Sequence, residues 1–164
     1  MTELTATQAE LAAGNLELAA QIALGRMLFE FSRLDLALSL LIVWSDEGKN
    51  IAGMTEKLER YTFTEKLSFL KELLNKLPVE RMSTKSAYAA WLRDAHRNRL
   101  IRNQMVHGQW GIDPYRAEVL NVVGLPTSTK QREIRYSIKR LSDTVDDIRK
   151  LQERLQDLRT RSTV

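Results

Sequence analysis

The stretch LGRMLFEFSRLDLALSLLIVW, residues 24–44, decides the fold class of this chain. Its apolar side chains recur at intervals of three or four residues, which is the spacing of one face of an α-helix. The residues on this face are Leu24, Met27, Leu28, Phe31, Leu34, Leu38, Leu41 and Ile42. Upstream, Thr7 and Glu10 have the spacing of a capping box. The pattern therefore predicts a long first helix from about Thr7 to about Trp44, with an interruption at Gly14.

A second helix is expected beyond a polar segment, residues 45–53, that is typical of a loop. Thr62 and Glu65 form another candidate capping box at its start, and Pro78 ends it, because proline cannot continue a helix. Its apolar face consists of Leu67, Leu70, Leu74 and Leu77. The sequence thus predicts a shorter helix in the second quarter of the chain.

The third helix is expected to begin with Ser83 or Thr84 as its cap and to end at Gly108. Its apolar residues are Tyr88, Trp91, Leu92, Ala95, Leu100 and Val106. After it, alternating apolar and polar residues surround Pro114, which suits the second position of a turn. A small β-hairpin is therefore predicted within residues 109–123.

A final long helix is expected after Ser128 and Gln131, which have the spacing of a cap. Its narrow apolar seam consists of Ile134, Ile138, Leu141, Val145, Ile148, Leu151, Leu155 and Leu158. We therefore expect an all-α fold, an up-and-down four-helix bundle with long first and last helices and a small β-hairpin insertion after the third helix. A single domain is expected over residues 1–164, with residues 1–14 frayed or peripheral.

Composition limits the class of protein. The 164 residues are 43% hydrophobic and 28% charged, which is a globular profile, and the net charge of +4 permits a polyanionic partner without requiring one. The absence of cysteine excludes disulfides and thiolate metal sites, and it fits a reducing compartment. The chain begins without the pattern of a signal peptide. Its most apolar stretch, residues 34–44, contains Asp35 and is too short to span a bilayer. These features predict a cytoplasmic protein with no membrane contact.

The first and last helices carry more apolar surface than two shorter helices can cover. A homodimer would bury the excess, and this is the interpretation that we favour. The alternative is a monomer whose own helices fill the seam.

The candidate for chemistry is Arg102-Asn103, followed by His107 and Gly108 at the end of the third helix. Arginine binds phosphate through a planar fork of donors, and histidine transfers protons near neutral pH. Helical spacing places Arg99, Asn103 and His107 on one face of the helix, and Arg102 on the neighbouring face. Gly108 is predicted to take the left-handed position that ends many helices.

A structural role for these residues is the alternative. His107 would then cap the helix, and Arg102 would be a surface charge paired with Asp94 or Glu118. Asn103 would belong to the pattern that ends the helix.

The motif and the helical pattern resemble the HEPN superfamily, which consists of small helical bundles with an arginine, a polar residue and a histidine four to six positions after the arginine. Arg102, Asn103 and His107 match this signature. The motif covers only about residues 100–110, and the architectural likeness extends over about residues 15–160. The resemblance implies a usually dimeric domain, and for many members a metal-independent endoribonuclease of toxin and defence systems. Other members are inactive scaffolds or RNA-binding modules, which remains the alternative.

For an active member, the resemblance implies attack of a ribose 2′-hydroxyl on the adjacent phosphate, which leaves a 2′,3′-cyclic phosphate. His107 would be the general acid or base, Arg102 would stabilise the developing charge, and Asn103 would orient His107 or contact a phosphate oxygen. No cofactor or metal is expected. The expected partners are RNA, a second copy of the chain, and a separately encoded antitoxin or nucleotidyltransferase.

Several other residues are candidates beside this motif. Arg97 and Arg99 are predicted to bind the RNA backbone, although they equally fit a solvated helix face. Trp110 is a core aromatic or the border of a nucleotide pocket. Glu30 is a candidate acid from another helix, or an exposed member of an ion-pair row. His96 is interpreted as a surface residue. A DNA-binding regulator ranks last, because the chain lacks a short helix-turn-helix pattern.

Overall fold

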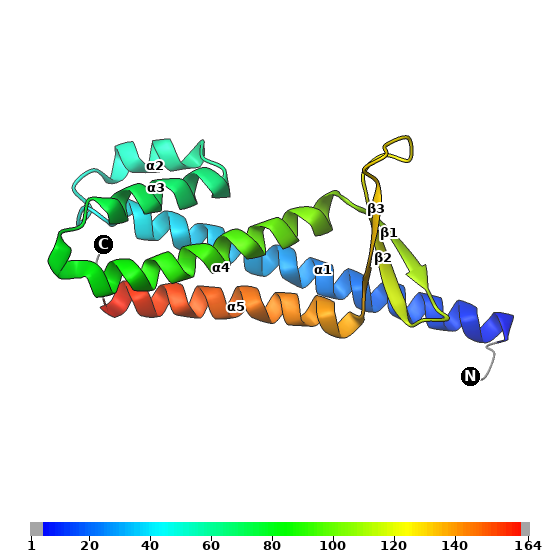
Figure 1. Ribbon diagram of the computed structural model, residues 1–164. Helices are drawn as coiled ribbons and strands as arrows, with labels where there is room; N and C mark the ends of the chain where they lie inside the picture. The colour runs from blue at the N-terminus through cyan, green and yellow to red at the C-terminus, as the bar shows by residue number, and fades with distance from the viewer. Residues whose placement is uncertain (1–4, 162–164) are drawn as a thin grey trace. The chain divides into compact units, whose positions relative to one another are not determined.

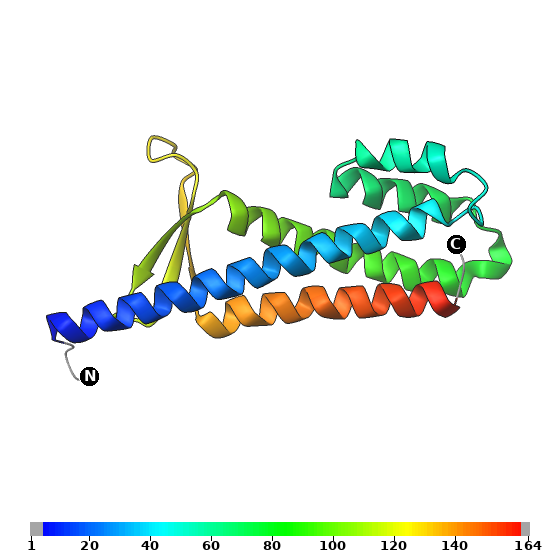
Figure 2. The same cartoon turned by 180° about the vertical axis from the view of Figure 1, so that it is seen from behind.

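The computed structural model describes residues 5–161, and in these residues the chain is mostly helical, with one small antiparallel sheet (Figures 1 and 2). The helices are α1 (Ala6–Val43), α2 (Ile51–Glu59), α3 (Phe63–Asn75), α4 (Met82–His107) and α5 (Ile138–Arg161), with a 3₁₀ turn, Val79–Arg81. The strands are β1 (Gln109–Asp113), β2 (Glu118–Val123) and β3 (Arg132–Tyr136). The predicted long first and last helices are therefore confirmed. No helix in the described residues has the length and apolar character needed to cross a membrane.

The chain divides into two compact units. One contains the sheet together with the first part of α1, the end of α4 and the start of α5, and is called the sheet unit below; its described residues are 5–29 and 100–146. The other, called the bundle unit, contains residues 30–99 and 147–161 and is helical.

The bundle unit has a core of large apolar side chains from four helices. α1 contributes Leu34, Leu38 and Ile42, α3 contributes Leu70, α4 contributes Tyr88 and Trp91, and α5 contributes Ile148 and Leu151. The indole Nε1 of Trp91 donates a hydrogen bond to the backbone oxygen of Leu151 at 2.9 Å, so its one polar group is satisfied inside this core. The face of α1 predicted from residues 31–42 is thus the buried one.

The sheet unit contains a three-stranded meander in the order β1-β2-β3. Trp110 of β1 lies opposite Asn121 of β2, and Asn121 lies opposite Ile134 of β3. The β1–β2 turn is closed where the Arg116 amide donates to Asp113 Oδ1 at 3.2 Å. The predicted hairpin is confirmed, and β3 extends it to a sheet.

The start of the last helix was predicted wrongly. Ser128 and Gln131 form a turn instead of a helix cap, and β3 follows them. α5 begins at Ile138, with the Arg140 amide donating to Ser137 Oγ at 3.1 Å. Ile134 therefore lies in a strand. Its four-residue spacing from Ile138 fits a helix, but charged residues alternate with Ile134 and Tyr136 at the period of a strand.

The other helix starts also differ from the predictions in part. The Thr62–Glu65 capping box is confirmed, with reciprocal hydrogen bonds between the two residues. The cap of α1 is instead a reciprocal pair of Thr5 and Gln8, not Thr7 and Glu10, and α1 continues through Gly14. Residues 6–14, expected to be frayed or peripheral, form the first turns of α1, whereas residues 1–4 lie outside the described residues.

Two further differences lie between α1 and α4. The predicted loop at residues 45–53 is shorter, because α2 begins at Ile51; α2 has Leu58 as its buried residue, too little apolar pattern to predict a helix. α4 begins at Met82 directly after the 3₁₀ turn, so Ser83 and Thr84 lie inside its first turn and do not cap it.

Candidate functional site

The three motif residues lie at the end of α4, in the sheet unit, where Arg102 and Asn103 are in contact. Arg102 and Asn103 are half-buried, and the Arg102 guanidinium donates from Nη1 to Asn103 Oδ1 at 3.1 Å. His107 is exposed at the last position of the helix, one turn after Asn103 and on the same face. The site therefore offers a guanidinium held by an amide, and an imidazole open to solvent.

Gly108 connects this helix end to β1. A Cβ at Gly108 would overlap the side chain of Asn121, so only glycine fits here without a shift of its neighbour. The backbone of Gly108 is outside the left-handed region, and the predicted left-handed end is wrong. The physical reason is that the chain passes directly from the helix into a strand, and the glycine is needed for close approach to β2.

Trp110 is packed against the motif helix. Its Nε1 donates to the backbone oxygen of Met105 at 3.0 Å, and its ring centroid lies 5.6 Å from that of Tyr136. It also lines a groove of about 470 Å³ on the sheet, together with Leu120, Val122 and Arg132. Trp110 is therefore both a packing residue and the border of a groove whose lining begins at Gln109, directly after Gly108.

Two residues that tie this region together were not predicted as part of the site. Gln104 donates from Nε2 to the Tyr136 hydroxyl at 2.5 Å, and Arg132 Nη2 lies 3.5 Å from Gln104 Oε1. Both contacts join α4 to β3. Because β3 was predicted as helix, the sequence offered no signal that would bring Arg132 near the motif.

Arg97 and Arg99 belong to the bundle unit, as does His96. Arg97 is exposed and lies 3.6 Å from Asp94, whereas Arg99 donates to Thr64 Oγ1 at 2.9 Å and lies 3.4 Å from His96. Arg99 thus contacts α3 even though helical spacing places it in line with Asn103 and His107.

The partners proposed for Arg102 in the structural alternative are held by other arginines. Asp94 accepts from Arg154 at 2.6 Å, and that hydrogen bond lowers the pKa of Asp94. Glu118 accepts from Arg135 at 3.4 Å.

Glu30 lies in the bundle unit with only 5% of its surface exposed, so the prediction of an exposed residue is wrong. Its carboxylate accepts from Arg149 at 3.0 Å, Arg33 at 3.1 Å and Gln152 at 3.2 Å. Burial by itself raises the pKa of Glu30, but these hydrogen bonds outweigh it and the pKa is lowered. The predicted ion-pair role is confirmed, with Arg33 and Arg149 as the partners, and Glu30 stays charged in this cluster.

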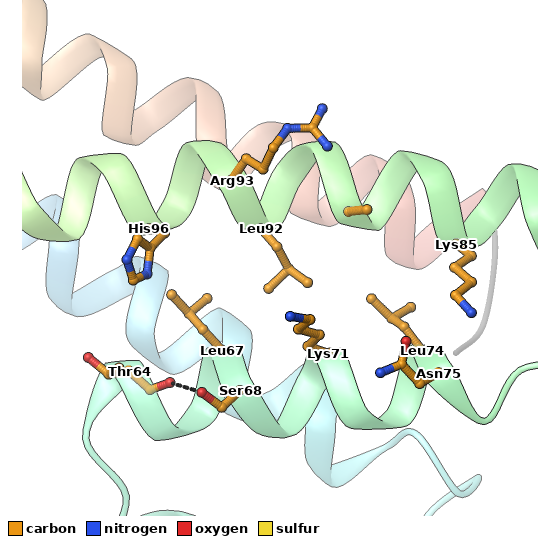
Figure 3. Close-up of a pocket in the computed structure, with 11 residues that line it drawn as sticks. Thr64, Leu67, Ser68, Lys71, Leu74, Asn75, Lys85, Leu92, Arg93 and His96 are labelled. Atoms are coloured by element: carbon orange, nitrogen blue, oxygen red, sulfur yellow. Dashed lines mark hydrogen bonds between the residues drawn. The ribbon is translucent and has the colours of Figure 1, made fainter.

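A separate groove of about 580 Å³ lies between α3 and α4 in the bundle unit (Figure 3). Leu67 and Leu74 of α3 and Leu92 of α4 point into it and form an apolar floor (Figure 3). Basic side chains surround the floor, namely Lys71, Lys85, Arg93 and His96, and no acidic residue lines the groove. None of the three motif residues contributes to it.

Comparisons with family models, curated proteins and solved structures found no match to this chain. Within residues 5–161, no group of three histidine or acidic side chains is arranged to hold a metal ion. Function must therefore be argued from the residues and their geometry.

Proposed function

We propose that this protein is a HEPN-like endoribonuclease that cleaves RNA without a metal ion, in a toxin or defence context. The observation that carries the proposal is the arrangement at the end of α4, where the Arg102–Asn103 pair lies one turn before the exposed His107. Arginine and histidine side chains can supply both the charge stabilisation and the proton transfer that RNA cleavage needs.

In the proposed reaction, the ribose 2′-oxygen attacks the adjacent phosphorus and the bond from phosphorus to the 5′-oxygen breaks. The 2′-hydroxyl loses its proton, and the leaving 5′-oxygen gains one. His107 acts in one of these proton transfers. Arg102 stabilises the negative charge that develops on the phosphate, and Asn103 positions its guanidinium through the hydrogen bond at 3.1 Å. The products are a 2′,3′-cyclic phosphate and a free 5′-hydroxyl.

The sheet groove suits the RNA beside the scissile bond. Trp110 is half-buried and borders this groove, so it is proposed as a contact to a base of the RNA, and Arg132 on the same groove offers a phosphate contact. Arg97 is exposed and Arg99 is half-buried, and both arginines are proposed as further contacts to the RNA backbone.

The test is cleavage of end-labelled RNA in excess EDTA by the parent protein, His107→Ala, Arg102→Ala and the control Val106→Ala. Val106 is an exposed neighbour of His107 on α4. We expect cyclic-phosphate products from the parent and the control, and a loss of at least about 100-fold in rate for the other two variants. Equal cleavage by all four proteins would contradict the proposal and indicate a contaminating nuclease, and no cleavage by the parent would also reject it.

A non-catalytic assembly module is the second candidate, and the groove between α3 and α4 favours it. An apolar floor whose rim carries basic side chains and no acidic ones fits the apolar face of an acidic amphipathic helix from a separately encoded protein. A labelled peptide with leucine on one face and glutamate on the others is a suitable probe. We expect Lys71→Glu combined with Lys85→Glu to weaken its binding at least about 10-fold, with the parent's affinity falling as salt rises. Equal binding by both proteins would reject this candidate.

A further inference from the structure

The first part of α1 has two apolar faces on opposite sides of the helix. Ala9, Ala20, Ala23 and Met27 lie on one face and are buried in the sheet unit. A second line of apolar side chains, about 180° round the helix, is exposed. One buried face is enough to hold α1 in its unit, so the second face requires a separate explanation.

This second line, called the α1 stripe below, consists of Leu11, Gly14, Leu18, Ile22, Gly25 and Phe29. Its large members are 68%, 58%, 47% and 70% exposed for Leu11, Leu18, Ile22 and Phe29 respectively. Both glycines face open space, since a Cβ built on either one meets nothing within 4 Å. An aligned row of exposed leucine, isoleucine and phenylalanine marks an interaction surface.

The order of residue sizes along the α1 stripe is the same in both directions: large, small, large, large, small, large. When the stripe is laid antiparallel on its own copy, with residue 20 at the centre, Leu11 comes opposite Phe29 and Leu18 opposite Ile22. Gly14 then comes one residue away from Gly25 across the interface, and the absence of side chains at both positions lets the two backbones approach. This is the self-complementarity that a two-fold symmetric interface requires.

The charges of α1 also favour the antiparallel orientation. In residues 6–29 the first half of the helix carries Glu10 and Glu17 and no basic residue, whereas the second half carries Arg26. A parallel pair would place the two acidic halves side by side. An antiparallel pair places each acidic half beside the half with Arg26, which is favourable.

We propose that two copies of this chain associate antiparallel through the α1 stripe, residues 11–29. The contact extends for about 27 Å of helix, at 1.5 Å per residue. The proposal stands on the exposed stripe and not on ribonuclease activity, so an inactive protein that dimerises through α1 would leave it intact.

The first experiment measures the mass of the parent protein in solution by sedimentation equilibrium, together with Leu18→Glu and the control Leu125→Glu. Leu125 is 72% exposed and lies outside α1. We expect a dimer for the parent and the control, and a dissociation constant raised at least about 100-fold for Leu18→Glu, because a charge would be buried in the stripe. Circular dichroism checks that the variant keeps its helices. A monomeric parent at tens of micromolar, or a folded Leu18→Glu variant that dimerises like the parent, would overturn the proposal.

The second experiment tests the antiparallel order, and the absence of native cysteine makes it simple. Leu11→Cys and Phe29→Cys are prepared separately and oxidised alone or as a mixture. Antiparallel pairing predicts a disulfide only in the mixture, because a disulfide needs Cα atoms within about 7 Å and two copies of residue 11 would be about 27 Å apart. Efficient cross-linking of each variant with itself would indicate a parallel dimer and reject the order proposed here, as would the absence of cross-links in the mixture.

Discussion

Gly108 lies directly against the buried side chain of Asn121, and this contact joins the end of the motif helix to the middle strand of the sheet. Asn121 is fully buried, and within the described residues neither its Oδ1 nor its Nδ2 has a hydrogen-bond partner. The side chain is therefore held by packing alone. His107 precedes Gly108 directly, so the position of the imidazole depends on this contact.

Gly108→Ala is expected to destabilise the protein by about 1–3 kcal/mol, because the new methyl group overlaps the fully buried side chain of Asn121. Chemical denaturation measures the loss. The matched control is Gly111→Ala on β1, where a Cβ makes an ordinary contact of 3.9 Å with Leu120. An equal loss at both positions would mean that the contact with Asn121 is not responsible.

Asn121→Ala is expected to rescue Gly108→Ala. The substitution removes the amide that the new methyl group meets, so the double variant should be more stable than the sum of the two single changes predicts, by about 1 kcal/mol or more. Chemical denaturation of the parent, the two single variants and the double variant completes this double-mutant cycle. Strict additivity would show that the two side chains do not compete for the same space.

The contact of Gly108 with Asn121 joins different elements of the fold, and contacts of this kind could not be predicted from the sequence. The buried face of α1 and the capping box of Thr62 and Glu65 depend on neighbours within a few residues, so their patterns were sufficient. β3 depends on pairing with β2. Three of its five residues are charged, and Ile134 and Tyr136 become covered only in the sheet, so the short alternation around them did not outweigh the helical spacing of Ile134 and Ile138.

The candidate site also has one part that the sequence predicts and another part that it does not. Helical spacing alone predicts that Asn103 and His107 share a face. The bond from Gln104 to Tyr136 crosses from α4 to β3, and the hydrogen bond from Arg99 to Thr64 crosses from α4 to α3. Partners of this kind are set by tertiary packing, which is why the spacing of Arg99 gave no indication of its contact with Thr64.

Glu30→Gln is expected to lower the free energy of unfolding by about 1–2 kcal/mol at pH 7. The change removes the charge that Arg149 and Arg33 contact, and the loss is modest because both arginines reach solvent. The pKa of Glu30 in the folded protein is below its ordinary value of 4.5. Its contribution is therefore fully present above pH 4.5 and is lost as the pH falls through the folded pKa.

The difference in stability between the parent and Glu30→Gln should accordingly be constant from pH 7 down to about 4.5 and shrink below it. Urea denaturation at a series of pH values measures this difference, and the other carboxylates cancel because both proteins share them. A difference that grows on acidification would contradict the assignment.

Trp110→Phe is expected to separate packing from RNA contact. Phenylalanine keeps an aromatic ring but loses the Nε1 donor to Met105, so the protein should lose about 1 kcal/mol of stability. On the proposed function, RNA affinity should fall much less for Trp110→Phe than for Trp110→Leu, which loses the stacking surface. Fluorescence anisotropy with labelled single-stranded RNA measures the RNA affinity of the two variants. Equal affinity of the two variants would assign Trp110 to packing alone.

Asn103→Asp tests the Arg102–Asn103 pair most directly, because stability and activity should respond in opposite directions. A carboxylate at position 103 would turn the hydrogen bond of 3.1 Å into a charge-assisted one, so the melting temperature should stay constant or rise. The same carboxylate would compete with the phosphate for the guanidinium and oppose the negative charge of the transition state. On the proposed function, RNA cleavage should therefore fall about 10- to 1,000-fold in kcat. A stable variant that cleaves RNA at the parent's rate would show that Arg102 does not act on the phosphate, whatever the role of His107.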